Sequence, residues 1–569
     1  MAFPIALKLC GQTAKYSLDP AALDSNEKQR SASNMASTYV PLDSWVYSAF
    51  DRLAALGYVQ TDFVALRPWT RMECARLVME AADRTADGES DSEAAALYRS
   101  LSNEFALELR REDGAANSGM QIESIYSQVI NIAGQPLTDG FHFGQTIVNA
   151  FGRPYGEGAN SYTGTALRAQ AGWLAFYVRG EYQHSGSVPA LSPAARSAIA
   201  QADFTPAAAE GPPSDVSRFR FLDAYAAVTF KNNQISFGKQ SLWWGPNFGG
   251  PMLYSDNAEP IPMLRYDRVS PFKLPGFLGS LGPIRIQLLI GRLTGYQFMN
   301  IPIPGQPGAS HVVGQPGIPL NPQPFIHGQK ISLNPTPNLE LSVARTVVFG
   351  GPGFPVTLGH FWHSFIATGA GSKGPNDPGD RRASFDFNYR IPGIRDWLTL
   401  YCDSFTNDEV FPLAYPTHSG WSPGIYLPKL PHLHKVDFRA EGAVTPYRQF
   451  PGFFYFDVNW LSGYTNNREL MGSWVGRQGS GFQLWSTYWF SARTTVQANF
   501  RSMWVDHSFL QGGRLQDFGL TTNVALGSEF SLQASAQFER WHFPLLAAGT
   551  VSNVTTALQL SYSPRWGTR

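Results

Sequence analysis

Apolar and polar residues alternate one for one along about seventeen segments between residues 123 and 562. In one of these segments Phe385, Phe387 and Tyr389 alternate with polar side chains, and the pattern recurs from Phe530 to Phe538. Successive side chains of a β-strand point to opposite faces, so a period of two separates an apolar face from a polar one. The sequence therefore predicts a mainly β fold over most of its length.

Soluble β-sandwiches also alternate, so the pattern alone leaves two fold classes open. Three features favour a membrane barrel: the segments are long and numerous, their polar faces carry charges and amides at mid-strand, and aromatic residues gather near their ends. Charged residues make up only 15% of the chain and aromatic residues 14%, which suits a lipid-facing surface. The aromatic residues that we expect to form an interfacial girdle include Trp485, Tyr488, Trp489 and Trp504.

No stretch of the chain approaches the roughly 18 consecutive apolar residues that a transmembrane helix needs. A closed barrel is the other way to cross a bilayer, because its strands satisfy one another's backbone hydrogen bonds. We therefore predict a large antiparallel transmembrane β-barrel of about 16–18 strands, since an even number is usual.

The connections between segments differ in length. Some are tight, such as Leu526–Glu529, whereas others are long and rich in proline and glycine. Outer-membrane barrels place short turns on the periplasmic side and long loops outside. The segments expected to be long extracellular loops are Ser185–Ser217, Gly295–Lys330, Gly369–Arg381 and Asp403–Lys435.

The N-terminal part of the chain has a helical period. Apolar residues recur every 3.6 positions after Leu42, and Gly57 stands where a helix would end. Thr70 and Glu73 have the spacing of a capping box that opens a second helix, and Ser90 has the same relation to Glu93 before a third apolar stripe.

These patterns divide the chain into three parts. Residues 1–38 lack periodicity and are expected to be a leader or a disordered segment. We predict a small helical bundle over residues 39–114, placed in the periplasm, and the outer-membrane barrel over residues 115–569.

One stretch of the barrel region, from Gly238 to Arg268, is dense in aromatic and hydrogen-bonding residues. Sugar rings stack their C–H faces on aromatic rings and pair their hydroxyls with planar polar groups. The alternative is that this stretch only closes a strand connection, with its rings packed inward. The candidate polysaccharide-binding residues here are Trp243, Trp244, Asn247, Asp256, Asn257 and Arg265.

A second glycine-rich stretch, Gly472–Gly481, precedes another strand. Its four glycines allow sharp turns, and Trp474 and Arg477 could face a sugar or an anionic uronate. In the other interpretation the loop is structural and Arg477 braces a carboxylate of the lumen. We leave both open.

Four motifs in order resemble the capsule-assembly Wzi family. They are Tyr39–Gly57, Arg67–Arg71, Gly238–Arg268 and Met471–Gly481, and the likeness extends from about Tyr39 to near the C-terminus. The resemblance implies an outer-membrane β-barrel that binds surface polysaccharide. The function comes from the resemblance, whereas alternation and composition predict only the barrel.

The sequence offers little support for catalysis, cofactors or nucleic acid. Lys plus Arg and Asp plus Glu are balanced at 44 each, which gives no electrostatic reason to expect a nucleic-acid partner. None of the nucleophile, phosphate-loop or zinc motifs is present. The close histidine pairs at 360/363 and 432/434 lack an evident third ligand, so we expect no metal and no cofactor. Of the three cysteines, Cys74 and Cys402 are expected to be packed rather than reactive, and Cys10 does not sit in a convincing lipoprotein signal.

Three functions remain to be compared. The first is a monomeric, non-enzymatic outer-membrane barrel that contacts membrane lipid and binds capsular or exopolysaccharide to help attach or assemble it at the cell surface. The second is a diffusion channel for small solutes, which the mixed charges of the lumen allow. The third is a glycan hydrolase using two lumen carboxylates, although such charges are routine on barrel walls.

Overall fold

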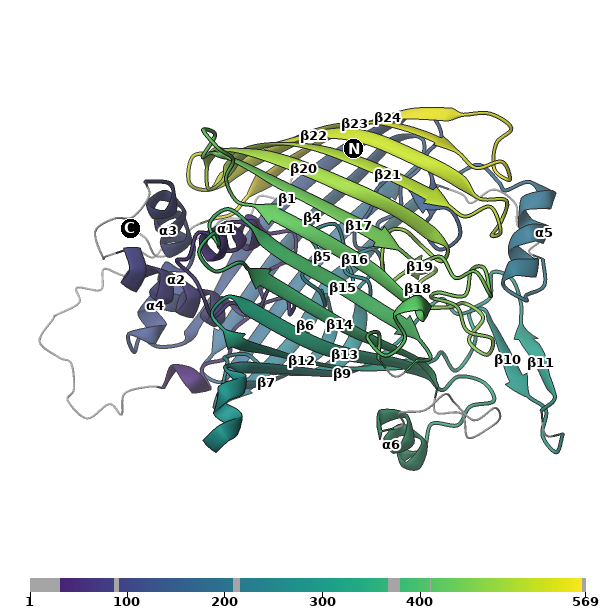
Figure 1. The fold of residues 1–569 in the computed structure, drawn as a ribbon, viewed down its shortest axis with the longest axis horizontal. Helices are drawn as coiled ribbons and strands as arrows, with labels where there is room; N and C mark the ends of the chain where they lie inside the picture. Colours follow the sequence, from purple (N-terminus) through teal and green to yellow (C-terminus); the bar gives the residue numbers. More distant parts are fainter. Residues whose placement is uncertain are drawn as a thin grey trace, which may run out of the picture.

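The computed structural model describes residues 31–85, 92–207, 215–306, 308–366, 379–409 and 411–564. Its main element is a single closed sheet of 18 antiparallel strands (Figure 1). Each strand pairs with the next along the wall, and β1 closes the barrel by pairing with both β24 and β4. The wall strands are β1 (Ser118–Ala133), β4 (Gly158–Ala171), β5 (Leu174–Ser185), β6 (Val216–Phe230), β7 (Asn233–Gln240), β8 (Ile261–Arg268), β9 (Ile284–Arg292), β12 (Phe325–Thr336), β13 (Leu339–Phe349), β14 (Asp380–Arg390), β15 (Thr399–Asn407), β16 (Ser419–Leu427), β17 (Val436–Val444), β20 (Gly479–Ser491), β21 (Thr494–Val505), β22 (Gly513–Leu526), β23 (Phe530–His542) and β24 (Val551–Tyr562).

The period-two pattern translates directly into the two faces of the wall. Phe518 and Phe538 are directly paired across β22 and β23 and both point outward, exposed. Their neighbours Asp517 and Glu539 point inward and are buried, and Arg501 forms an ion pair with each of them. The predictions of a barrel and of 16–18 strands are confirmed.

Short strands and further helices lie in the connections. The short strands are β2 (Thr138–Asp139), β3 (Gly144–Gln145), β10 (Phe298–Pro302), β11 (Ser310–Gly314), β18 (Thr465–Asn466) and β19 (Glu469–Leu470). The helical segments are η1 (Ala32–Asn34), α1 (Trp45–Ala55), α2 (Arg71–Thr85), α3 (Ser92–Glu104), α4 (Ala106–Glu112), α5 (Pro193–Ala202), η2 (Gly276–Leu281), α6 (Leu358–Ile366) and η3 (Pro416–His418). Across the described ranges, none of these helices is both long and apolar enough to span a bilayer.

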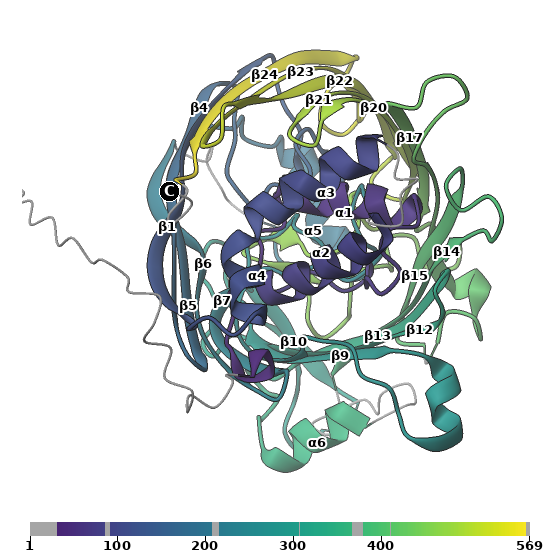
Figure 2. The same cartoon turned by 90° about the vertical axis from the view of Figure 1, so that its left-hand side faces the viewer.

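The two ends of the barrel differ. Helices α1–α4 lie at one end, which we call the bundle end, where the strands are joined by short turns (Figure 2). One such turn is Lys231–Asn232, whose positive φ angles of 49° and 62° match the twist of a tight hairpin. The long connections, with α5 and the β10–β11 hairpin, lie at the opposite end, which we call the loop end (Figure 1).

The helices follow the sequence signals where the structure describes them. Ser44 caps α1, and Gly57 after its end has a φ of 98°, a conformation that glycine adopts without strain. The Thr70 hydroxyl accepts a hydrogen bond from the Glu73 amide, as in a capping box. The third apolar stripe is divided into α3 and α4, and Ser90 lies outside the described residues.

Much of the interior of the barrel is filled. Buried side chains of segments 242–263, 293–299 and 454–471 pack against inward residues of the wall such as Ile326 and Phe405, and we call this packed mass the inner plug. The helical bundle has its own core, which includes Cys74 and reaches the wall at Trp489. The hydrophobic core of this protein therefore lies mainly inside the barrel rather than between layers.

Three expectations need correction. Residues 31–38 are packed against the barrel rather than disordered: Ala36 is fully buried and its amide donates to the Gly172 carbonyl. The rest of the predicted leader, residues 1–30, lies outside the described residues. Cys10 lies outside the described residues. Of the four predicted girdle residues, Tyr488 and Trp504 are exposed, whereas the other two point inward, because strand parity puts Trp485 and Trp489 on the lumen face of β20.

The third correction concerns the loop expected at 403–435, which contains the wall strand β16. Pro423 interrupts the alternation there, and the ladder between β16 and β17 skips from Trp421 to Gly424. Proline has no N–H to donate, so its presence hid a strand in the sequence.

Candidate functional site

The stretch Gly238–Arg268 leaves the wall after β7, passes through the inner plug and returns as β8. Trp244 is fully buried, and its indole Nε1 donates to the Gln287 side chain at 2.8 Å. Trp243 is half-buried and is held through its backbone, which exchanges hydrogen bonds of 3.0 and 3.1 Å with Arg67 before α2. The two tryptophans thus face different surroundings.

The polar candidates of this stretch are buried and bonded within the protein. Asn247 donates to the Ser422 hydroxyl at 2.8 Å, and Asn257 donates to the Gly472 carbonyl at 3.1 Å. Arg265 forms an ion pair with Asp267 at 2.9 Å. Asp256 is buried and its backbone carbonyl accepts from the Phe151 amide at 2.7 Å.

The second predicted motif is also inside. Trp474 is buried in a cluster near the start of β20. Arg477 is buried between the rings of Phe141, Phe456 and Phe509 and forms an ion pair with Asp203 at the end of α5.

The eight candidates therefore differ in solvent exposure, and the difference does not follow the two motifs. A polymer in solvent reaches none of the seven buried side chains in this conformation, and only Trp243 keeps a partly open face. Their direct contact with polysaccharide stays a prediction.

Arg477 belongs to a charged network that joins α5 to the plug. The His142 ring lies between the carboxylates of Asp139, 2.7 Å away, and Asp203, 2.9 Å away. Burial by itself lowers the pKa of His142, but the two carboxylates overcome this and raise it to about 9. His142 is therefore protonated at neutral pH and carries a charge that holds the network together.

A cavity of about 580 Å³ lies between the helical bundle and the wall. Trp243, Phe248 and Trp485 line one part of it, with the Phe248 and Trp485 rings 5.2 Å apart edge to face. Amide and hydroxyl side chains of β21–β24, such as Gln497 and Gln533, line the wall opposite. Its size and mixture of groups are typical of a small-molecule site, and Trp243 and Phe248 link it to the predicted stretch.

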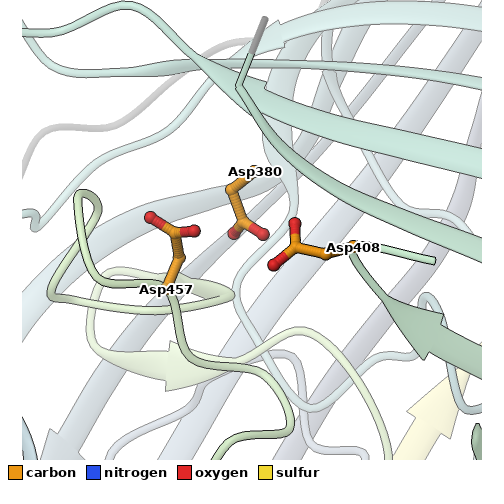
Figure 3. A group of neighbouring side chains, drawn as sticks. All are labelled: Asp380, Asp408 and Asp457. Atoms are coloured by element: carbon orange, nitrogen blue, oxygen red, sulfur yellow. The ribbon is translucent and has the colours of Figure 1, made fainter. Parts of the chain in front are cut away.

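Three carboxylates meet at the loop end, where Asp380, Asp408 and Asp457 point toward one another (Figure 3). Carboxylate oxygens are the ligands that hard cations such as Ca²⁺ prefer. Here, however, Arg382 already forms an ion pair with Asp380, and the Asp457 carboxylate accepts the backbone amides of Asn459 and Trp460. These contacts indicate that the carboxylates hold the neighbouring loop segments together.

Five ring side chains form a row at the loop end, which we call the aromatic ledge: Tyr415, His418, Tyr447, Phe450 and Phe453. Tyr415 and Phe450 are exposed and the other three rings are half-buried. The Tyr447 ring lies 5.3 Å from His418, 6.1 Å from Phe450 and 5.4 Å from Phe453. Phe450 is 63% exposed and Tyr415 43% exposed.

The inner plug supports the ledge from below. The Tyr447 ring lies 6.2 Å from the buried ring of Phe454, which belongs to the plug. Arg448 and Gln449 are exposed beside the rings, and Gln449 accepts from the Tyr447 hydroxyl at 3.1 Å. Apolar faces beside amide and guanidinium groups form the combination expected of a sugar-binding surface.

Sequence reasoning missed the ledge because its members come from two connections, 408–418 and 445–478, that meet only in space. One signal was present in the sequence, because the connection 408–418 falls within the predicted long loop 403–435. The density of aromatic residues from Tyr447 to Tyr455 was a second signal that could have directed attention here.

Comparison with known proteins identifies similar chains. The family model described as "Capsule assembly protein Wzi" matches residues 128–556. A 55.8 kDa protein of the cps region of Klebsiella pneumoniae is 28% identical over 221 residues, which is 37% of this chain and 39% of that protein. The match thus spans less than half the length of that relative.

Among solved structures, the Escherichia coli protein Wzi superposes with a TM-score of 0.63 at 17% identity, covering 93% of this chain and 100% of that one. It is described as an outer membrane protein involved in group 1 capsule assembly and as a carbohydrate-binding β-barrel. At this identity the likeness establishes the shared fold. The Pseudomonas aeruginosa protein OccK7 superposes with a TM-score of 0.40 at 10% identity, covering 79% of this chain and 100% of that one.

Proposed function

Because the chain belongs to the capsule assembly protein Wzi family, we propose that it is a non-catalytic outer-membrane barrel that binds surface or capsular polysaccharide. Its role is to help attach or assemble that polymer at the cell surface. The family membership supports the link to capsule, and the closed 18-stranded wall supports the membrane location.

The orientation follows from the two unlike ends. Short turns characterise the periplasmic side of outer-membrane barrels and long loops the outer side. On this basis α1–α4, within the proposed domain 39–114, lie in the periplasm, and the loop end of the barrel domain 115–569 faces the outside.

The aromatic ledge is the observation that carries the proposal. It lies at the loop end, where a surface polymer would arrive, with Tyr415 and Phe450 exposed, and the plug beneath it limits its movement. Rings held in advance lose little conformational freedom on binding, so stacking on sugar is favoured. No nucleophile is needed for this function.

The experiment is a binding titration with surface polysaccharide from the cell that makes the protein, using the full chain in detergent. In the variant Tyr447→Ala/Phe450→Ala two stacking surfaces are lost. At about 0.5–1.5 kcal/mol for each ring, affinity should fall about tenfold.

The matched control is Phe277→Ala, which removes an exposed ring from η2 at the bundle end. This control should bind as the unaltered protein does. Unchanged binding by the Tyr447/Phe450 variant would remove the ledge from the proposal, and absence of binding by the unaltered protein would overturn the function itself.

The channel alternative makes an opposite prediction. With the bundle at one end and the plug at the other, we expect no steady open pore in planar-bilayer conductance. A stable open conductance at low voltage would favour the diffusion channel instead.

A further inference from the structure

Helix α6 lies outside the barrel, against the outer face of β12 and β13 (Figure 2). Its Phe361 and Phe365 rings face the wall, each 5.7 Å from the ring of His327. The Ser364 hydroxyl is 3.0 Å from the His327 ring nitrogen. The helix is thus docked on a surface that, elsewhere on the wall, faces lipid.

The opposite side of α6 is an apolar stripe. Leu358, Trp362 and Ile366 are spaced four residues apart, so they share one face of the helix, and they are 84%, 58% and 51% exposed. An apolar helix face that is exposed at the membrane interface turns into the acyl region. The position of α6 toward the loop end fits the interface of the outer leaflet in the proposed orientation.

Two arginines on the same outer face lie close to α6. Strand parity places Arg345 of β13 and Arg381 of β14 outward, and they are diagonal neighbours, since Arg345 pairs with Ala383 and Val347 with Arg381. The outward residues toward the bundle end, such as Val343 and Phe385, are apolar. The pair therefore stands at the edge of the lipid-facing band, where a charge costs about 0–1 kcal/mol rather than about 2–4 at mid-membrane.

Among the described residues, no carboxylate lies in direct ion-pair contact with either arginine; the charge that Arg381 feels at longer range is that of Asp457. Arg345 donates to the Ser364 carbonyl at 3.2 Å, which fixes the end of α6. Arg381 is only 5% exposed, yet its Nε and Nη1 groups have no hydrogen-bond partner.

We propose that this outer surface, formed by Arg345, Arg381 and helix α6, binds the phosphorylated headgroup of a membrane lipid in the leaflet at the loop end. Guanidinium groups match phosphate oxygens in charge and geometry. The stripe of Leu358, Trp362 and Ile366 supplies the adjacent acyl contact. The occupant is a lipid because the surface lies on the outer wall, and only the choice of leaflet rests on the proposed orientation.

The test is native mass spectrometry of the full-length barrel in mild detergent, titrated with lipid A, a glycolipid that carries phosphates. A second titration uses the same lipid after its phosphates have been removed, and a third adds inorganic phosphate as a competitor. The unaltered protein should retain the phosphorylated lipid and should not retain the dephosphorylated one. Free phosphate should compete only weakly, since it lacks the acyl contact.

The variant Arg345→Gln/Arg381→Gln should retain the phosphorylated lipid about tenfold less, the effect expected when charged hydrogen bonds are lost. The control Lys231→Gln removes one positive charge from an exposed turn at the bundle end and should change nothing. Equal retention of both lipids by the unaltered protein would overturn the proposal, and so would equal retention by the arginine variant. If the variant does not fold, the comparison of the phosphorylated and dephosphorylated lipids in the unaltered protein still tests whether the protein recognises the phosphate. No polysaccharide is involved, so failure here leaves the proposed capsule function standing.

Discussion

Glu108 is one of several buried groups that join the helical bundle to the barrel; another is Asp51 of α1, which pairs with Arg439 of β17. Glu108 of α4 is fully buried and contacts Arg71 of α2 at 3.0 Å, Arg168 of β4 at 2.8 Å and Arg111 at 3.5 Å. Burial raises the pKa of Glu108, but Arg71 and Arg168 more than compensate and hold it well below its usual range. The carboxylate is therefore ionised and linked to both parts of the molecule.

Replacing Glu108 by Gln keeps the shape and removes the charge. Three arginines would then face one another, and Arg168 would keep no ion-pair partner among the residues that the structure describes. Removing one member of a buried ion pair costs about 3–5 kcal/mol, because the remaining charge stays desolvated. The free energy that holds the bundle on the wall should fall by about this amount.

Hydrogen–deuterium exchange measures that free energy locally. Amides of α2 and α4 should exchange about 100-fold or more faster in Glu108→Gln, since about 3 kcal/mol corresponds to two decades. The control Glu104→Gln removes a partly exposed partner of Arg71 and should change exchange by less than about tenfold. An effect of Glu108→Gln no larger than that of the control would refute the reasoning.

The same linkage sets the pH response of the bundle. Because the pKa of Glu108 is lower in the folded protein, its charge stabilises the docked bundle at pH values above the ordinary glutamate pKa of 4.5. This stabilisation is lost as pH falls through the lower folded value. Exchange in the unaltered protein should therefore approach that of Glu108→Gln only in strong acid.

The remaining predictions use other parts of the fold. The folded pKa of His142 is raised from 6.5 to about 9, so the stability that its charge contributes is complete below pH 6.5 and is lost as pH rises toward 9. The thermal unfolding temperature should follow this pH dependence in the unaltered protein and should lose it in His142→Asn. Burial raises the pKa of the Cys74 thiol well above its usual range, so peptide mapping after maleimide treatment should find Cys74 unmodified until the chain is unfolded. Trp244→Ala should lower the free energy of unfolding in urea by about 3–5 kcal/mol through the cavity it leaves, whereas Phe277→Ala should change it by about 0.5 kcal/mol or less.

The prediction of the candidate site was less complete than that of the wall. Trp243 and Trp244 are adjacent in a motif that resembles the family, yet one lines a cavity and the other lies in the plug. Arg477 could brace a carboxylate or face a sugar, and its burial beside Asp203 supports the first alternative. Residue type tells what a side chain can contact, and only the packing of distant segments decides what it does contact.

The sequence by itself determined the wall of this barrel. Alternation is a local property, because each residue faces opposite to its neighbour whatever the rest of the chain does. For that reason the alternation alone is enough to assign Phe518 and Asp517, or Phe385 and Asp386, to opposite faces of the wall. The helix start at Thr70 is equally local, since a cap acts within one turn.

Tertiary structure decided what fills the barrel and what covers it. Two parts of one connection have different fates: 454–471 folds into the plug, while 445–453 contributes to the ledge. The outward His327 and Arg345 are exceptions to the apolar outer face because α6 packs on them. These outcomes depend on contacts between residues far apart in the chain, such as Trp244 with Gln287 and Glu108 with Arg168, and no local period encodes which loop reaches which wall.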